Sequence, residues 1–341
     1  MPQTLHLLTP DAQYADDAVV ERETAGPGVR WTIQRERRPE RLDQDAIATA
    51  DAVVVWHEMP IDHDFIRRLK ACRIIVRAGV GFDHIDLEEA GRAGIPVANT
   101  PDYGTSEVAD HAIALMLAFT RGIVSYHNAL VHDVHAGFDC TVAPLVRRIR
   151  GRTFGVIGLG RIGTAAALRA RGMGMRIVAY DPYVSRGTEI ALGVERTESL
   201  EALLQQSDVV SIHCPLTAET RNMIDAAALG RMKRDAILVN TARGAIVDIP
   251  ALIAALRDGT IAAAGIDVLP VEPPAREEAI GEAMRAFQGT DLAHRLILTP
   301  HAAWGSPESA HDARRLAVET AMLYLRQGIL RNCVNAQWLR S

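Results

Sequence analysis

Short apolar runs alternate with amphipathic stretches along the first hundred residues of the chain. Strands are expected at 5–8, 52–56, 73–77 and 97–99, and helices at 64–71 and 87–93. Strands that alternate with helices at this pace are typical of βαβ units, which build parallel sheets. From residue 105 to residue 121 apolar positions recur with a helical period, which predicts a longer helix.

A second and longer α/β series begins at Gly151. The expected strands are 154–157, 177–180, 209–213, 237–240, 262–268 and 296–298, and the expected helices are 162–171, 200–206, 227–232, 249–256 and 308–330. This succession of strands predicts a doubly wound parallel sheet, with the N-terminal part of the chain as a smaller α/β domain. The helices at 105–121 and 308–330 then connect the two domains.

Length and composition agree with this division. The 341 residues correspond to roughly two domains of about 150 residues each. Hydrophobic residues make up 48% and charged residues 23%, which excludes a disordered chain. The net charge of −5 offers no bulk attraction to nucleic acid or to an anionic membrane, so we expect neither as a partner.

The termini and the cysteines bear on the cellular location. No basic residue precedes Arg22 and no apolar core follows the first methionine, so a signal peptide is not expected. The most apolar long window, 108–119, is too short to span a bilayer. Four distant cysteines without a CxxC pair and twelve histidines without an HExxH pattern indicate neither disulfides nor a metal site. We expect a reduced, cytoplasmic protein without a bound metal.

A glycine-rich turn separates the strand expected at 154–157 from the helix expected at 162–171. The sequence Gly158-Leu159-Gly160-Arg161-Ile162-Gly163 matches the GxGxxG fingerprint. Its first glycine makes a tight turn, its second admits the pyrophosphate of a dinucleotide, and its third lets helix and strand pack closely. The start of the helix, at Arg161 and Ile162, supplies free N–H donors for the phosphates.

Asp181 ends the next strand, 18 residues after Gly163. The fingerprint expects an acid about 20 residues on, where it binds the ribose hydroxyls; a solvent-exposed aspartate at a strand end is the alternative. Because a carboxylate repels a 2′-phosphate, the sequence favours NAD as the cofactor, although Arg186 leaves NADP open. The remaining candidate cofactor-binding residues stand at the ends of later strands: Cys214, Pro215, Thr241, Ala242 and Asp267.

Three polar residues that follow predicted strands carry the chemistry for oxidising an alcohol beside a carboxylate. His301 is the usual type of acid or base at neutral pH, the fork of Arg243 suits a carboxylate, and Glu272 can orient an imidazole. Since the carboxyl ends of parallel strands meet at one edge, we expect the three to converge. Taken singly, they are also explained as a core histidine, a loop-capping arginine and a surface acid.

A second glycine turn, Gly79-Val80-Gly81, follows a strand of the N-terminal part. Its backbone amides can grip a carboxylate as a small nest. An ordinary turn from strand to helix explains the same spacing.

Five stretches occur along the chain in a fixed order. They are RAGVGFDHIDLEEA (77–90), GIPVANTPDYGTSEVADHAIALML (94–117), GVIGLGRIG (155–163), LVNTARGAIVD (238–248) and LTPHAAW (298–304). Together they resemble the D-isomer-specific 2-hydroxyacid dehydrogenase family, most clearly from Ile74 to Asn335. Several motifs in the same order make this a specific resemblance.

The resemblance implies an NAD(P)-linked dehydrogenase that is commonly a homodimer. It implies that Arg243 binds substrate, Glu272 supports the histidine and His301 is the acid or base. It also implies an α/β architecture of two doubly wound domains. These are a flavodoxin-like substrate domain at 1–103 and 302–341, and a Rossmann NAD-binding domain at 104–301. The segment 105–150 would lie at the dimer interface.

Within that family the chain is most similar to the C-terminal-binding-protein branch, on the stretches 56–57, 75–77, 181–183, 300–304 and 332–335. This similarity implies that Arg77 and Trp304 line the substrate pocket, with His57 beside them. A packing aromatic and a surface cation are the alternatives for Trp304 and Arg77. Asp110 departs from the glutamate of most members, and the segment 273–291 is longer than usual.

We therefore predict reversible hydride transfer between NAD(H) and C2 of a small 2-oxo acid or D-2-hydroxy acid. Two alternatives stay open. One is an NAD(H)-responsive dimeric binding protein, similar to a corepressor, with vestigial activity, and the other is a short phosphoglycerate dehydrogenase. The complete set of Arg243, Glu272 and His301 favours the enzyme, because a sensor needs only the cofactor site.

Overall fold

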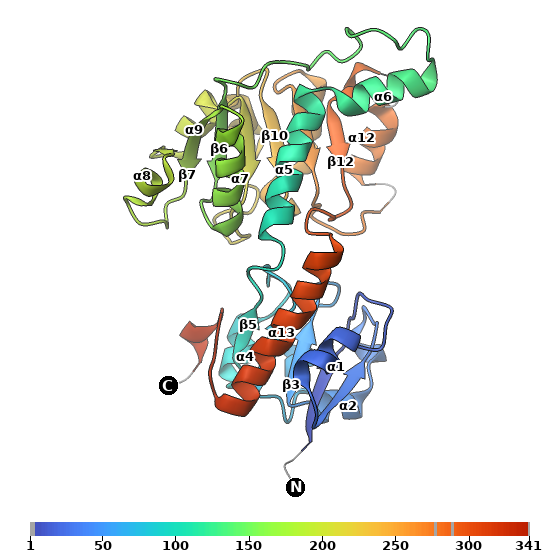
Figure 1. Ribbon diagram of the computed structural model, residues 1–341, viewed down its shortest axis with the longest axis vertical. Coiled ribbons are helices and arrows are strands. Elements are labelled where there is room, and N and C mark those ends of the chain that lie inside the picture. Colours follow the sequence, from blue (N-terminus) through green and yellow to red (C-terminus); the bar gives the residue numbers. More distant parts are fainter. Residues whose placement is uncertain (1–3, 276–277, 288–289, 340–341) are drawn as a thin grey trace. The chain divides into compact units, whose positions relative to one another are not determined.

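Parallel β-sheets form the centre of each of two units (Figure 1). The computed structural model describes residues 4–275, 278–287 and 290–339. The chain divides into a smaller unit, Met1–Gly104 with Gly305–Ser341, and a larger unit, Thr105–Trp304. The predicted fold class, two parallel-sheet α/β domains, is confirmed.

The smaller unit has a flavodoxin-like sheet. Its strands are β1 (Leu5–Thr9), β2 (Val29–Ile33), β3 (Ala52–Val55), β4 (Ile74–Arg77) and β5 (Val97–Asn99). Its helices are α1 (Val19–Ala25), α2 (Gln44–Thr49), α3 (His63–Ile66), α4 (Leu87–Arg92) and α13 (Pro307–Gln327), with the 3-10 helices η1 (Pro39–Arg41) and η4 (Ala336–Trp338). The strands are parallel in the order β2-β1-β3-β4-β5, which is the flavodoxin-like arrangement.

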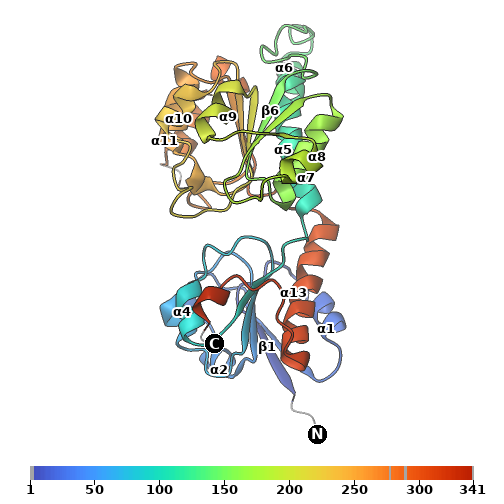
Figure 2. The ribbon, with the colours of Figure 1, turned by 90° about the vertical axis from the view of Figure 1, so that its left-hand side faces the viewer.

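Helices cover both faces of this sheet. Helices α1 and α13 lie on one side, and α2 and α4 lie on the other (Figure 2). Every residue of β3 and β4 is buried, as expected for a parallel sheet covered on both faces. The helices of the second side begin at aspartates, because Asp43, Asp62 and Asp86 accept backbone N–H groups at the N-caps of α2, α3 and α4.

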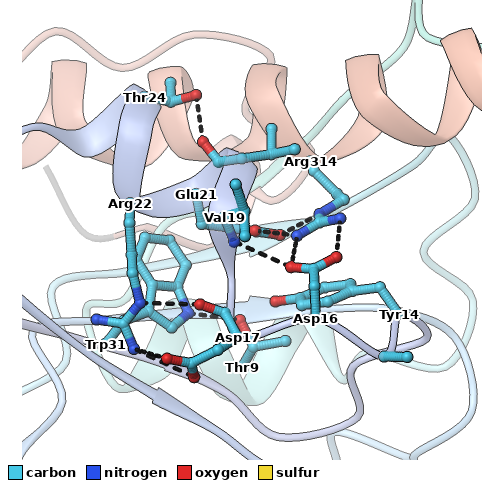
Figure 3. Close-up of polar contacts among 12 residues, drawn as sticks. Thr9, Tyr14, Asp16, Asp17, Val19, Glu21, Arg22, Thr24, Trp31 and Arg314 are labelled. Atoms are coloured by element: carbon cyan, nitrogen blue, oxygen red, sulfur yellow. Dashed lines mark hydrogen bonds and ion pairs between the residues drawn. The ribbon is translucent and has the colours of Figure 1, made fainter.

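An arginine of α13 fixes this C-terminal helix to the N-terminal part of the smaller unit (Figure 3). Arg314 donates to both carboxylate oxygens of Glu21 at 2.7 and 2.6 Å and to both of Asp16 at 2.8 and 2.7 Å. Its hydrogen bonds lower the pKa of Asp16 to about 2. The guanidinium also lies 3.7 Å from the ring centroid of Tyr14. Since Glu21 is only 2% exposed, the guanidinium compensates a charge that water does not reach.

The larger unit has a Rossmann-type sheet. Its strands are β6 (Thr153–Ile157), β7 (Arg176–Tyr180), β8 (Glu195–Arg196), β9 (Val209–Ile212), β10 (Ile237–Asn240), β11 (Ala263–Ile266) and β12 (Leu296–Leu298). Its helices are α5 (Thr105–Thr120), α6 (Ile123–His132), α7 (Arg161–Gly172), α8 (Thr188–Leu192), α9 (Leu200–Gln206), α10 (Ala226–Arg231), α11 (Ile249–Arg257) and α12 (Ala279–Phe287), with the 3-10 helices η2 (Gly244–Ile246) and η3 (Asp291–His294). The parallel order β12-β11-β10-β9-β6-β7-β8 reverses direction between β6 and β9, where doubly wound sheets bind their ligands.

Alternate residues of each central strand face opposite layers of helices. Ile237 and Val239 of β10 pack in the core beneath α5 and α7, whereas Leu238 packs in the core beneath α9, α10 and α11. Figure 2 shows these two layers on opposite sides of β6. Both faces are therefore apolar, and polar side chains collect at the ends of the strands.

Two predicted helices end three or more residues earlier in the structure. Helix α3 stops at Ile66, because the amides of Arg68 and Leu69 bond to carbonyls three residues back and tighten the chain into turns. Helix α13 stops at Gln327, because Gly328 takes a left-handed φ of 68° and caps it. The sequence did not indicate two edge strands. Strand β2 is half-exposed, and strand β8 is very short.

The described residues include no single helix that is long and apolar enough to cross a membrane. Helices α5 and α6 pass that test only together, as a pair bent by 55°.

Candidate active site

The GxGxxG turn joins β6 to α7 in the larger unit, as predicted. Gly158 has a φ of +90°, and a Cβ there would lie 2.6 Å from the amide nitrogen of Cys214. A Cβ on Gly163 would lie 2.0 Å from the carbonyl oxygen of Gly158, so the helix packs directly on the turn. Gly160 has open space around it and precedes Arg161 and Ile162, the first residues of α7. This open backbone at a helix N-terminus is suited to a pyrophosphate.

Asp181 directly follows β7, and its carboxylate is hydrogen-bonded to the backbone of the glycine turn. Its Oδ2 accepts the backbone N–H of Leu159 at 2.8 Å, and its Oδ1 accepts that of Tyr183 at 2.9 Å. The carboxylate therefore lies directly beside the glycine turn. Arg186, which left NADP open, pairs with Glu198 at 3.0 Å on an exposed part of the unit.

Other candidate cofactor-binding residues follow the neighbouring strands. Cys214 and Pro215 come after β9, and Thr241 and Ala242 come after β10. Burial raises the pKa of the Cys214 thiol to about 11, so it is a neutral group. The hydroxyl of Thr241 is buried without a hydrogen-bond partner among the described residues. Buried hydroxyls normally have a hydrogen-bond partner, so this one fits a site in which a bound polar ligand supplies the partner. These residues therefore suit NAD.

Arg243 extends from the same edge, directly after β10. Its backbone carbonyl accepts the side-chain amide of Asn240 at 2.9 Å, and its Nη1 donates to the carbonyl of Ala242 at 2.7 Å. The next residue must be glycine, because a Cβ on Gly244 would lie 1.9 Å from the backbone of Leu269. The loops after β10 and β11 are therefore in direct contact. The positive charge of Arg243 is one of the causes that lower the pKa of Glu272.

Glu272 and His301 form the hydrogen-bonded pair predicted from the sequence. His301 Nδ1 lies 2.6 Å from Glu272 Oε2, and Glu272 Oε1 accepts the backbone N–H of Leu269 at 2.7 Å. Burial raises the pKa of Glu272, but the hydrogen bond and charge of His301 and the Leu269 amide outweigh burial, so the pKa is lowered overall. A charged carboxylate at Nδ1 leaves Nε2 as the nitrogen that can exchange a proton with a ligand.

Asp267, predicted to bind cofactor, lies directly after β11 and is 1% exposed. Its Oδ1 accepts the amide of Ala302 at 2.9 Å and its Oδ2 accepts the amide of Ala303 at 3.0 Å. The carboxylate therefore holds the loop that carries His301. Trp304 is half-buried and ends the larger unit just beyond this loop.

In the smaller unit, Arg77 ends β4 and folds back onto the glycine turn. Its guanidinium donates to the carbonyls of Ala78 and Gly81, the latter at 2.8 Å, and the residue is only 5% exposed. The carbonyl of Gly79 accepts the backbone N–H of Thr100, and that of Val80 accepts the side-chain amide of Asn99 at the end of β5. The amides of Val80 and Gly81 have no hydrogen-bond partner among the described residues. A turn whose carbonyls are occupied and whose amides are not is suited to bind a carboxylate as a nest.

His57 lies after β3 in the same unit, half-buried and 3.4 Å from the amide nitrogen of Gln13. Sequence reasoning missed Asp11, whose carboxylate accepts the amides of Trp56 at 2.9 Å and Glu58 at 3.3 Å and so holds the turn containing His57. Burial raises the pKa of Asp11 to about 6. The signal was available, because Asp11 closely follows β1, at the carboxyl end of a strand.

His111 and Thr299 were also missed. They form a hydrogen bond of 3.0 Å within the larger unit, and Thr299 donates to Asp267. The longer segment at 273–291 contains α12, and residues 276–277 and 288–289 of it lie outside the described part of the chain.

Comparison with known proteins places these residues in a family context. Residues 113–303 match the family model described as D-isomer specific 2-hydroxyacid dehydrogenase, NAD binding domain. The chain is 39% identical over 293 residues to a glyoxylate reductase from Korarchaeum cryptofilum, covering 86% of this chain and 85% of that protein. It is 38% identical over 259 residues to a glycerate dehydrogenase from Methylorubrum extorquens, covering 75% and 77% respectively.

A solved structure shows the same fold with ligands bound. It is an NADPH-dependent glyoxylate/hydroxypyruvate reductase from Sinorhizobium meliloti in complex with NADP and malonate. The two chains superpose with a TM-score of 0.83 at 28% identity, over 97% of each.

Proposed function

The chain belongs to the D-isomer-specific 2-hydroxyacid dehydrogenase family, and from that membership we propose that it reduces glyoxylate or hydroxypyruvate. The reaction is a hydride transfer between a nicotinamide cofactor and C2 of a small 2-oxo or 2-hydroxy acid. The choice of acid is supported by the relatives, which are a glyoxylate reductase and a glycerate dehydrogenase. Glycerate is the product expected when the C2 carbonyl of hydroxypyruvate is reduced.

The observation that carries the proposed mechanism is the hydrogen bond between Glu272 and His301. NADH supplies the hydride when bound. In reduction, the imidazolium of His301 gives its Nε2 proton to the carbonyl oxygen, while Glu272 holds the ring through Nδ1. Arg243 pairs with the substrate carboxylate and stabilises the negative charge that develops on the oxygen.

For the cofactor, we propose that the glycine turn holds the pyrophosphate and that Asp181 accepts the ribose hydroxyls. A carboxylate beside the turn disfavours a 2′-phosphate, which supports NAD over NADP. The ion pair between Arg186 and Glu198 supports the same choice. Glu198 neutralises the arginine whose charge would otherwise favour the 2′-phosphate of NADP.

In the smaller unit, we propose that the amides of Val80 and Gly81 bind a carboxylate, with Arg77 fixing the carbonyls behind them. The pocket roles of Arg77, Trp304 and His57 rest on the similarity to the C-terminal-binding-protein branch. The relatives named above give that branch no support, so these three roles stay predictions.

We also propose a homodimer built on the segment 105–150. Large apolar side chains are exposed there, among them Val131 at 72%, Val134 at 73% and Phe138 at 85%. Several large apolar side chains exposed within one short segment are typical of a protein–protein interface. A cytoplasmic location remains a prediction; the four cysteines are all free thiols, which is compatible with it.

The test is NADH oxidation with a panel of 2-oxo acids, followed by the same assay on His301→Ala. We expect turnover with glyoxylate or hydroxypyruvate, and a variant that binds NADH normally but does not turn over. Undiminished turnover by His301→Ala would refute the assigned acid. No NADH oxidation with any acid, including pyruvate and 3-phosphohydroxypyruvate, would favour the NAD(H)-responsive binding protein instead.

A further inference from the structure

The loop that carries His301 has an unusual backbone conformation. His301 has a φ of +52°, in the left-handed region that residues other than glycine rarely occupy. This conformation aims the imidazole at Glu272. A conformation of this kind persists only when the surrounding contacts enforce it, so the contacts of the loop from Thr299 to Ala303 decide where the reacting histidine lies.

Asp267 supplies most of these contacts. Its main-chain carbonyl accepts the N–H of His301 at 2.8 Å, and its two carboxylate oxygens accept the amides of Ala302 and Ala303. Oδ1 also accepts the hydroxyl of Thr299 at 2.5 Å. The carboxylate thus binds the loop on both sides of His301.

The direction of the Thr299 bond determines what His111 does. The Thr299 hydroxyl donates its one hydrogen bond to Asp267. Its oxygen therefore accepts the Nε2–H of His111 at 3.0 Å. His111 Nε2 is also 3.8 Å from Asp267 Oδ1. His111 stands on α5, which packs against β10 and β11, so a rigid helix is linked through Thr299 to the loop of His301.

We propose that His111 is a positioning residue for the reaction, acting through Thr299 and Asp267 to hold His301 in line with Glu272. The proposal rests on the proposed function of His301 as the proton donor. His111 itself touches neither reacting group; it fixes the hydroxyl rotor of Thr299, and with it the carboxylate that holds the loop. A small displacement of an acid–base group costs orders of magnitude in rate, so the loss of this contact is measurable.

The first test compares His111→Ala with His111→Gln, which keeps an N–H donor. We expect kcat to fall about 10- to 100-fold in His111→Ala, with the Kd of NADH and the KM of the acid nearly unchanged, and to recover in His111→Gln. His311→Ala, on the exposed part of α13, is the matched control and keeps wild-type kcat. A kcat of His111→Ala within about twofold of the wild type would overturn the proposal.

Thr299 provides a second and independent pair of variants. Thr299→Val removes the hydroxyl at constant shape and lowers kcat as His111→Ala does, whereas Thr299→Ser retains it. The double variant His111→Ala/Thr299→Val is expected to be no slower than Thr299→Val alone, because both changes break one chain of contacts. Multiplying effects would show that His111 acts elsewhere and would overturn the proposal.

A readout without turnover separates this proposal from the proposed function. In proteins labelled with [15N]histidine, the ring signals of His301, identified by their loss in His301→Ala, are expected to move in His111→Ala and Thr299→Val. They are expected to return in His111→Gln and Thr299→Ser. Unmoved signals would overturn the positioning role. A wild type inactive on every acid would contradict the proposed function, while this spectrum would still decide the role of His111.

Discussion

Glu272→Gln is the perturbation whose effect the geometry predicts most closely. Each carboxylate oxygen of Glu272 faces an N–H donor, Leu269 N at 2.7 Å from Oε1 and His301 Nδ1 at 2.6 Å from Oε2. Glutamine has one acceptor oxygen, so its NH2 group must face one of the two donors. The variant therefore loses one hydrogen bond to a charged group.

The expected cost follows from these contacts. A hydrogen bond to a charged group contributes about 1.5–3 kcal/mol. The Glu272 side chain is 32% exposed and that of His301 24%, so solvent screening places the loss in the lower half of that range. A loss of about 1.5–2 kcal/mol corresponds to a fall in kcat of about 10- to 30-fold.

The assay is steady-state reduction of hydroxypyruvate at saturating NADH, with the Kd of NADH measured by its fluorescence. The matched control is Glu282→Gln, the same change on an exposed residue of α12, which keeps wild-type kcat. A kcat for Glu272→Gln within about threefold of the wild type would refute the assigned support of His301. A raised Kd for NADH with unchanged kcat would refute it as well.

Three further predictions concern stability, cofactor choice and assembly. Arg314→Leu is expected to lower the free energy of unfolding in urea by about 3–5 kcal/mol, because Glu21 stays buried without its partner. The pKa of Asp16 is lowered to about 2 in the folded state, so its part of that stability is present above about pH 4 and lost as the pH falls towards 2; a difference between variant and wild type that grows in acid would contradict this. Asp181→Ser is expected to shift the kcat/KM ratio of NADH to NADPH by about tenfold towards NADPH, and an unchanged ratio would exclude Asp181 as the selector. Phe138→Glu is expected to dissociate the dimer in sedimentation experiments, and a monomeric wild type would contradict the proposed interface.

The parts of the fold that sequence reasoning recovered are those that local patterns determine. Continuous apolar runs such as β3 and β10 belong to parallel strands covered on both faces, and those runs are visible without any tertiary information. The glycine turn was equally visible, because Gly158 and Gly163 each meet a local steric requirement. Edge strand β2 was missed because its residues are only partly buried, which leaves no clear apolar pattern.

The site residues that could be predicted from the sequence are those that follow the carboxyl ends of predicted strands. Glu272 and His301 were both expected at the carboxyl edge of the larger sheet, and the structure places them in hydrogen-bond contact. The direction of a side chain is not in the pattern, which is why the folding of Arg77 back onto its own turn was not anticipated. Contacts between distant segments are equally hidden, since His111 and Thr299 are 188 residues apart and neither carries a motif of its own.

The most direct test of the central claim follows the hydride itself. The protein is incubated with NADH carrying deuterium at both C4 positions and with hydroxypyruvate, and the product is examined by mass spectrometry and chiral chromatography. We predict D-glycerate with one deuterium at C2, and the same position labelled in glycolate when glyoxylate is used. Unlabelled product, or no product from a protein that binds NADH, would contradict the account.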